Sequence, residues 1–192
     1  ISNLLDLVFP RVCFSCLEEA APQQGSIFCV KCMFEIPYTD HFENAENDLV
    51  KLFYGKGNIK HAAALMFFTE GGVVQNILHN FKYKKMLEIG TQLGHVAGDK
   101  VLNSKYFENI DVIIPVPLHK DKQYKRGFNQ SEVFGSAIAS KLKRPLLNNV
   151  LIRNKFTETQ TRKSKTERKE NVNDAFVVKD HSKIVAKHVL LV

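Results

Sequence analysis

Apolar and polar positions change period from one segment of the chain to the next, which predicts alternating strands and helices. Residues 58–70 alternate apolar side chains and end at a glycine pair, the pattern of a strand. In residues 73–81 the apolar positions recur at the spacing of one helix face, and residues 86–102 are predicted to form a further helix. Residues 110–117 are almost continuously apolar, as expected of a strand that is covered on both faces.

A helix and further strands are predicted after residues 110–117. Asn129 is placed to cap the helix, and Glu132 stands three positions later as a capping-box partner. The predicted buried face of this helix consists of Val133, Phe134, Ala137, Ile138 and Leu142. Apolar runs at residues 175–178 and 188–192 are predicted strands. This order of elements predicts an α/β fold with a mostly parallel sheet, flanking helices and ligands at the carboxyl ends of the strands.

The composition indicates a folded chain with a basic surface. Of the 192 residues, 44% are apolar, which is enough for one domain with a core and a small appendage. The formal net charge of +7 favours phosphates or nucleic acid as partners. No apolar run approaches the roughly 18 residues of a membrane span, and the first residues lack the basic start of a secretory signal. We therefore expect a cytoplasmic protein without a membrane span.

The four cysteines form two pairs with the spacing of a metal site. Cys13 and Cys16 are separated by two residues, as are Cys29 and Cys32, and a hairpin turn is predicted at residues 22–26. Two such pairs can complete a tetrahedral shell of four thiolates around Zn²⁺. An iron or iron–sulfur centre takes the same ligands and stays open as an alternative, whereas disulfides are disfavoured in a reducing compartment. A four-thiolate centre leaves no position for a substrate, so the predicted zinc is structural, and its loss should unfold about the first 40 residues.

A basic segment precedes the helix that Asn129 caps. Lys125, Arg126 and Gly127 are followed by Asn129 and Gln130. We expect a loop here, running from the carboxyl end of a buried strand to the amino terminus of a helix, where backbone donors and the helix dipole favour an anion. Phosphate or pyrophosphate is the expected occupant. The alternative is a solvated basic loop that binds nothing.

Several motifs, taken together, resemble those of the ComF family of competence-associated proteins. They occur in the family's order, as LVFPRVCFSC, CVKC, FKYKK, IIPVPLH and KRGFNQSE, followed by the spaced residues Arg153, Gln160, Arg168, Asn171 and Phe176. The family joins a zinc ribbon to a type I phosphoribosyltransferase domain, and the resemblance implies a role in the uptake or handling of transforming DNA. The chain is also similar to the phosphoribosyl-binding part of amidophosphoribosyltransferases, but no cysteine outside the two pairs is present to act as a glutaminase nucleophile.

The resemblance implies a division of the chain into three parts. Residues 1–40 would form a zinc ribbon with a short N-terminal helix, residues 41–57 a connector with a short helix near residues 47–53, and residues 58–192 a phosphoribosyltransferase-like domain. In type I phosphoribosyltransferases a strand like residues 188–192 runs into two acidic residues and a loop that holds the ribose 5-phosphate. We therefore expect the domain to be truncated before that loop.

The resemblance further implies that the protein binds phosphoribosyl pyrophosphate with Mg²⁺. A complete version would be a glycosyltransferase that displaces pyrophosphate from the anomeric carbon. The expected phosphate and pyrophosphate contacts are Lys125, Arg126, Gly127, Asn129, Gln130, Arg153, Gln160, Lys165 and Arg168. The long polar segment 154–173 is interpreted either as a lid over the substrate or as surface disorder. No His, Asp or Glu stands out as a base, so no catalytic residue is predicted.

A different class of function remains open, that of a non-catalytic adaptor that binds single-stranded DNA. The zinc ribbon and the basic segments would follow the phosphate backbone, while Phe81, Tyr83 or Tyr124 would stack on bases. Such an adaptor would work with a DNA-uptake helicase. Binding that falls steeply with salt would distinguish it from a phosphoribosyltransferase.

Overall fold

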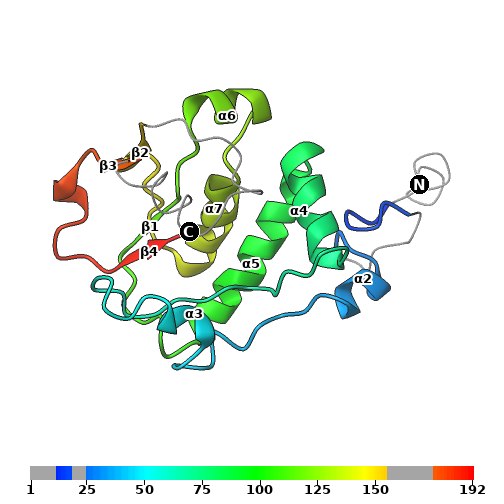
Figure 1. The fold of residues 1–192 in the computed structure, drawn as a ribbon, viewed down its shortest axis with the longest axis horizontal. Helices are drawn as coiled ribbons and strands as arrows, with labels where there is room; N and C mark the ends of the chain where they lie inside the picture. Colours follow the sequence, from blue (N-terminus) through cyan, green and yellow to red (C-terminus); the bar gives the residue numbers. More distant parts are fainter. Residues whose placement is uncertain (1–11, 19–24, 155–174) are drawn as a thin grey trace. The chain divides into compact units, whose positions relative to one another are not determined.

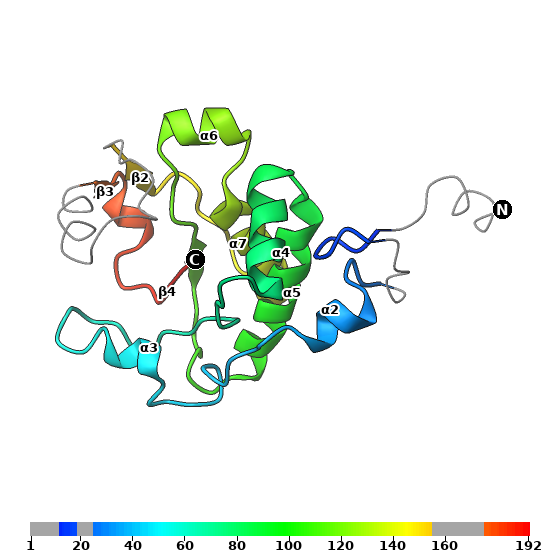
Figure 2. The ribbon, with the colours of Figure 1, turned by 45° about the vertical axis from the view of Figure 1, so that its right-hand side comes forward.

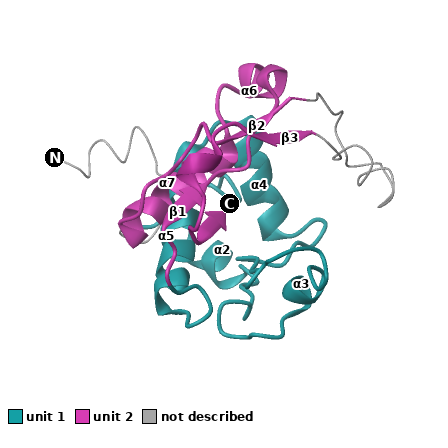
Figure 3. Ribbon diagram, turned by 90° about the vertical axis from the view of Figure 1, so that its left-hand side faces the viewer, with its two compact units in different colours: residues 1–108 teal, residues 109–192 magenta. Residues whose placement is uncertain are grey.

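The computed structural model describes residues 12–18, 25–154 and 175–192 (Figure 1). The chain divides into two compact units, unit 1 with residues 1–108 and unit 2 with residues 109–192 (Figure 3). The boundaries expected after residues 40 and 57 stay a prediction. None of the helices within the described ranges is long and apolar enough to cross a membrane.

The described regular structure of unit 1 consists of helices joined by turns and extended segments. Its two long helices, α4 (Val73–Tyr83) and α5 (Leu87–Asn103), lie side by side (Figure 2) and confirm the two helices predicted from periodicity. The buried side chains on the facing surfaces include Val74, Ile77 and Phe81 from α4 and Ile89, Leu93, Ala97 and Val101 from α5. The short helices α2 (Val30–Phe34) and α3 (Asp48–Lys51) precede them, and α3 confirms the helix expected near residues 47–53.

The strand predicted at residues 58–70 is wrong. This segment is extended, but it makes only an isolated antiparallel bridge between Tyr38 and Met66. The Phe67 N–H donates to the Pro37 carbonyl at 2.9 Å, and Pro37 has no N–H to extend the ladder. Residues 61–66 of this segment are half-buried and residues 67–70 are exposed, so the alternating sequence pattern does not correspond to one buried face.

Unit 2 combines a parallel strand pair with an antiparallel one. Strand β1 (Val112–Ile114) is fully buried and pairs in parallel with β4 (Val189–Leu191), and Ile113 makes an isolated parallel bridge to Leu146. Strand β2 (Leu151–Arg153) pairs in antiparallel fashion with β3 (Phe176–Val178). These strands confirm a mixed helix-and-sheet fold with a small parallel sheet, and the phosphoribosyltransferase-like topology stays a prediction.

Helix α7 (Gln130–Leu142) packs against the parallel pair. Its cap is as predicted, because the Asn129 side chain accepts from the Ser131 N–H at 3.1 Å, whereas Glu132 accepts from the side-chain amide of Asn148 at 2.6 Å. An added Cβ at Gly135 would lie 2.7 Å from a methyl group of Val192, so the helix approaches the end of β4 closely at this glycine. The fully buried positions of α7 are Gly135, Ala137, Ile138 and Ala139, while Val133, Phe134 and Leu142 are only half-buried.

The basic segment expected to be a loop is the helix α6 (Lys120–Arg126). His119 caps it by accepting from the Asp121 N–H at 3.3 Å, and the cations of its last turn complement the helix dipole. Gly127 ends the helix at φ +86°, a left-handed conformation that favours glycine. The expectation of a loop is wrong. A run of charged residues suggests a loop, but these residues form a helix with a cap at each end. After α7, a 3₁₀ turn, η2 (His181–Lys183), precedes β4.

Candidate metal and anion sites

The four cysteines of unit 1 come together as their spacing predicts. Their sulfur atoms all lie within 4.8 Å of one another, and none is in a disulfide. Three of the four are buried and Cys16 is half-buried. A cluster of four sulfur ligands fits a tetrahedral Zn²⁺ and leaves no ligand position open. The predicted turn at residues 22–26 falls mostly outside the described residues.

Backbone N–H groups surround the sulfur atoms. The N–H groups of Ser15 and Cys29 point at the Cys13 sulfur at 3.4 and 3.3 Å, and the Cys32 N–H points at the Cys29 sulfur at 3.5 Å. The second pair is placed by α2, because Cys29 caps this helix and Cys32 lies in its first turn. Such N–H donors stabilise negative charge on a thiolate.

The electrostatics of the cluster differ from one cysteine to the next. Burial raises the pKa of Cys32 to about 12. Burial also acts to raise the pKa of Cys13, but the N–H groups of Cys29, Cys16 and Ser15 outweigh it and lower the pKa to about 7. The Cys13 thiol therefore ionises more readily than the Cys32 thiol, and a bound cation would favour the thiolate form.

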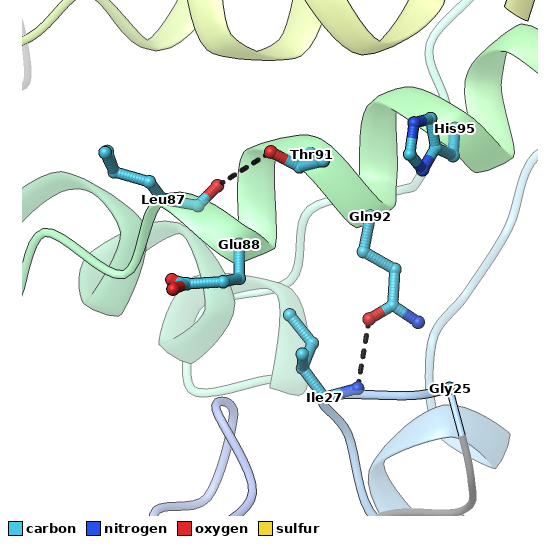
Figure 4. Close-up of a pocket in the computed structure, with 7 residues that line it drawn as sticks. All are labelled: Gly25, Ile27, Leu87, Glu88, Thr91, Gln92 and His95. Atoms are coloured by element: carbon cyan, nitrogen blue, oxygen red, sulfur yellow. Dashed lines mark hydrogen bonds between the residues drawn. The ribbon is translucent and has the colours of Figure 1, made fainter.

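Side-chain amides from the two long helices hold the cysteine-bearing segments. The Asn80 side chain on α4 donates to the carbonyls of Phe14 and Ser15 at 2.9 and 3.1 Å. Gln92 on α5 accepts from the Ile27 N–H at 3.0 Å (Figure 4). Sequence reasoning missed both residues, although an asparagine on the apolar face of α4 is a signal, because a buried polar side chain needs partners.

A pocket of about 350 Å³ lies beside this contact between residues 25–27 and α5 (Figure 4). Its lining consists of Gly25, Ile27, Leu87, Glu88, Thr91, Gln92 and His95. The Thr91 hydroxyl donates to the Leu87 carbonyl at 3.5 Å, and Gln92 is engaged with Ile27. Of these two polar side chains, Gln92 joins α5 to the segment that precedes the second cysteine pair, and Thr91 bonds within its own helix.

In unit 2 the carboxyl ends of the parallel strands meet the amino terminus of α7. The pairing of β1 and β4 continues past both strands, since the Val192 N–H donates to the Ile114 carbonyl at 3.0 Å and the Val116 N–H to the Val192 carbonyl at 2.6 Å. The Asn129 side chain donates to the Val116 carbonyl at 3.1 Å. Asn129 therefore fixes the segment after β1 against the first turn of α7.

The junction between α6 and α7 holds a guanidinium–amide pair. The Arg126 guanidinium donates to the side-chain oxygen of Gln130 at 2.6 Å, and both side chains are half-buried. The side-chain nitrogen of Gln130 is buried and has no hydrogen-bond partner among the described residues. The Gly127 N–H is engaged as the helix cap, donating to the Gln123 carbonyl at 2.7 Å, and Lys125 is exposed. The junction thus offers one guanidinium and one buried amide donor.

Lys122 is a cation of this region that sequence reasoning left out of the site. Its pKa is lowered by burial and then by the positive charges of Arg153 and Arg126. Lys122 and Arg126 are four residues apart on α6, so they share a helix face, and Arg153 at the end of β2 lies near enough to act on them. Their common face could be recognised only once the segment was known to be a helix.

For several of the other predicted contacts the structure gives no position. Gln160, Lys165 and Arg168 lie outside the described residues, as does nearly all of the expected lid. Among the residues expected to stack on bases, Phe81 is only 5% exposed, so that expectation is wrong for Phe81. Tyr83 and Tyr124 are 64% and 90% exposed.

The charge of the chain is concentrated in unit 2. By sequence, unit 2 carries 17 Lys and Arg against 8 Asp and Glu, whereas unit 1 carries 10 against 12. The positive excess of the whole chain therefore comes from unit 2 alone. By net charge, unit 2 is the part of the chain with the stronger long-range attraction for an anion.

Comparisons with known proteins give relatives but no structural template. The chain is 31% identical over 103 residues to "Competence protein F" of Haemophilus influenzae. Over 103 residues it is also 29% identical to "DNA utilization protein YhgH" of Shigella flexneri and 28% identical to the protein of that name from Escherichia coli K12. Each match covers 52% of this chain and 45% of the relative, so it spans less than half of each relative's length.

No family model matches the chain, and no solved structure matches it. The relatives nevertheless include a protein that carries the competence name, and they match about half of the present sequence. They confirm the resemblance to the ComF family that the motifs indicate.

Proposed function

We propose that the protein is a ComF-type factor in the cytoplasmic handling of incoming DNA, with a phosphoribosyl pyrophosphate site in unit 2 and a structural Zn²⁺ in unit 1. The names of the relatives, "Competence protein F" and "DNA utilization protein YhgH", support the link to DNA uptake. Because the match spans less than half of those proteins, their names support a class of process and no particular substrate.

One observation carries the proposal for unit 2. The ends of the parallel pair β1 and β4 adjoin the junction where Arg126 meets Gln130, and Lys122 and Arg153 add positive charge nearby. A group of cations at the carboxyl ends of parallel strands is where an α/β fold binds phosphorylated ligands. Several cations suit a ligand with two linked phosphoryl groups better than a single phosphate.

The roles of the residues follow from this arrangement. Arg126 would bind pyrophosphate oxygens, with its guanidinium aimed by Gln130, and Asn129 would keep the strand end and the helix in register. Mg²⁺ would accompany the diphosphate and share its charge. If the full protein turns over substrate, these cations would stabilise the charge that develops on the departing pyrophosphate. The acceptor and any catalytic base are not assigned.

The proposal is tested by calorimetric titration of the full chain with pyrophosphate, phosphoribosyl pyrophosphate and inorganic phosphate, each with Mg²⁺. We expect both diphosphates to bind at least about tenfold more tightly than phosphate, because more than one cation can engage them. Equal and weak binding of all three anions would contradict the proposal.

A second function is favoured by a separate observation. The 90% exposed ring of Tyr124 stands among the cations of α6, on the unit that carries the positive excess. An exposed aromatic ring beside cations suits stacking on the bases of single-stranded DNA. Fluorescence anisotropy with a labelled oligonucleotide should give affinity that falls steeply between about 50 and 200 mM salt and weakens in Tyr124→Ala. A flat salt response would remove this function.

A further inference from the structure

Asn80 is a polar residue on the apolar face of α4, only 3% exposed. Both of its hydrogen bonds go to a segment far away in the sequence. They reach the carbonyls of Phe14 and Ser15, the two residues that separate Cys13 from Cys16. The two carbonyls hold the Asn80 side chain firmly. If they moved away, the buried amide would have no hydrogen-bond partner, at a cost of about 1–3 kcal/mol.

The geometry of the peptide bond connects these carbonyls to the sulfur of Cys13. The Phe14 carbonyl and the Ser15 N–H belong to one planar trans peptide unit, so they point in opposite directions. Asn80 takes the carbonyl end at 2.9 Å, and the N–H end faces the Cys13 sulfur at 3.4 Å. The next peptide unit is held at its carbonyl end as well, because the Ser15 carbonyl accepts from the Asn80 side chain at 3.1 Å.

We infer that Asn80 is a positioning residue for metal binding, which orients the two peptide units between Cys13 and Cys16 so that the Ser15 N–H donates to the Cys13 thiolate. The inference rests on the proposal that the four cysteines hold a metal ion. Asn80 itself touches no sulfur. It fixes the carbonyl ends of two peptide units, and the N–H at the opposite end of the first unit, that of Ser15, stabilises the thiolate, as partners of metal ligands commonly do.

The test is metal affinity of the full chain, measured with Co²⁺ through its thiolate absorption and with Zn²⁺ by competition. Asn80→Ala should weaken both affinities by about 10–100-fold. Asn80→Asp should weaken them more, because a carboxylate of the same size cannot donate to two carbonyls and adds negative charge near the thiolates. Asn80→Gln keeps the amide and should retain more affinity than Asn80→Ala.

The control is Asn76→Ala, the same change at an exposed position one turn earlier on α4. It should bind Co²⁺ as the unchanged chain does. The absorption spectrum of the bound Co²⁺ separates positioning from packing, since a purely structural residue would lower the apparent affinity through coupled folding and leave the spectrum of the bound metal unaltered. If Asn80→Ala does not fold, the comparison is made between Asn80→Gln and Asn80→Asp.

The outcomes are distinct. An unchanged chain that binds neither Co²⁺ nor Zn²⁺ removes the metal centre itself. An unchanged chain that binds both, with the Asn80 variants matching it in affinity and cobalt spectrum, overturns the role of Asn80 and leaves the metal centre standing.

Discussion

The candidate sites of the two units are built differently. In unit 1 four sulfur atoms lie within 4.8 Å of one another, and side-chain amides from two helices hold the segments that carry them. In unit 2 the cations come from α6 and β2 and lie around the half-buried junction between Arg126 and Gln130. The cysteine cluster is complete within the described residues. The cationic group contains Arg126 and Arg153 of the predicted set, and three further predicted contacts lie outside the described residues. Four cysteine thiolates are by themselves a specific set of metal ligands. Lysine and arginine are common on protein surfaces, so an anion site depends on how the fold brings several of them together.

The largest effect that would test this contrast is expected from removal of the metal. Cys29→Ser or a strong chelator should remove on the order of 10 kcal/mol of metal-linked folding energy. Hydrogen exchange should show loss of protection in residues 12–18 and 25–34, extending to the turns of α4 and α5 around Asn80 and Gln92, while β1 and α7 of unit 2 keep theirs. Protection lost equally in both units would show that they do not differ in this way.

The next test concerns the guanidinium of unit 2. Arg126→Ala should weaken pyrophosphate binding by about 1.5–3 kcal/mol, the usual contribution of a hydrogen bond to a charged group, without lowering the melting temperature markedly. Calorimetry measures the affinity. The matched control is Arg144→Ala, an exposed arginine of the same unit, which should bind as the unchanged chain does. Loss of affinity in both variants to the same degree would indicate attraction to overall charge.

A smaller effect is expected from pH. The pKa of Lys122 lies below the ordinary lysine value of 10.5, mainly because of burial and then because of Arg153 and Arg126. As pH rises, Lys122 should lose its proton before exposed lysines do. Pyrophosphate affinity should therefore start to fall at a lower pH than that at which exposed lysines lose their protons. Lys122→Arg, which keeps its charge, should bind with an affinity that stays level over the same range. Identical pH profiles for the two proteins would exclude Lys122 from the site.

The smallest effect concerns the packing of α7. Gly135→Ala places a methyl group 2.7 Å from Val192, and overpacking of about 1–3 kcal/mol should exceed the gain of about 1 kcal/mol in helix propensity. We expect a slightly lower melting temperature for unit 2. Ser136→Ala, at the neighbouring exposed position, is the control and should not be destabilised. A more stable Gly135→Ala would show that the end of β4 moves aside easily.

The comparison also shows what sequence reasoning can reach. The cysteine spacing was sufficient to predict the cluster, because two pairs of cysteines spaced in this way have few roles other than binding a metal ion or forming disulfides. The cap at Asn129 and the buried strand β1 were predictable from local patterns. Lys122 and Asn80 were not, because their roles depend on partners at Arg153 and at Phe14 and Ser15, which only tertiary structure brings near. The strand predicted at residues 58–70 failed for the same reason, since a strand needs a neighbour that periodicity does not supply.

The pairing of β1 with β4 has a consequence for how the chain matures during translation. Val112 lies beside Val189, and nearly the whole of unit 2 separates them in the sequence. The buried β1 therefore leaves the ribosome long before its partner is synthesised, at about 5–20 residues per second, and its apolar edge stays open for several seconds. Unit 1, whose helices α4 and α5 are neighbours in sequence, can assemble during that interval, so we expect unit 2 to complete its fold last.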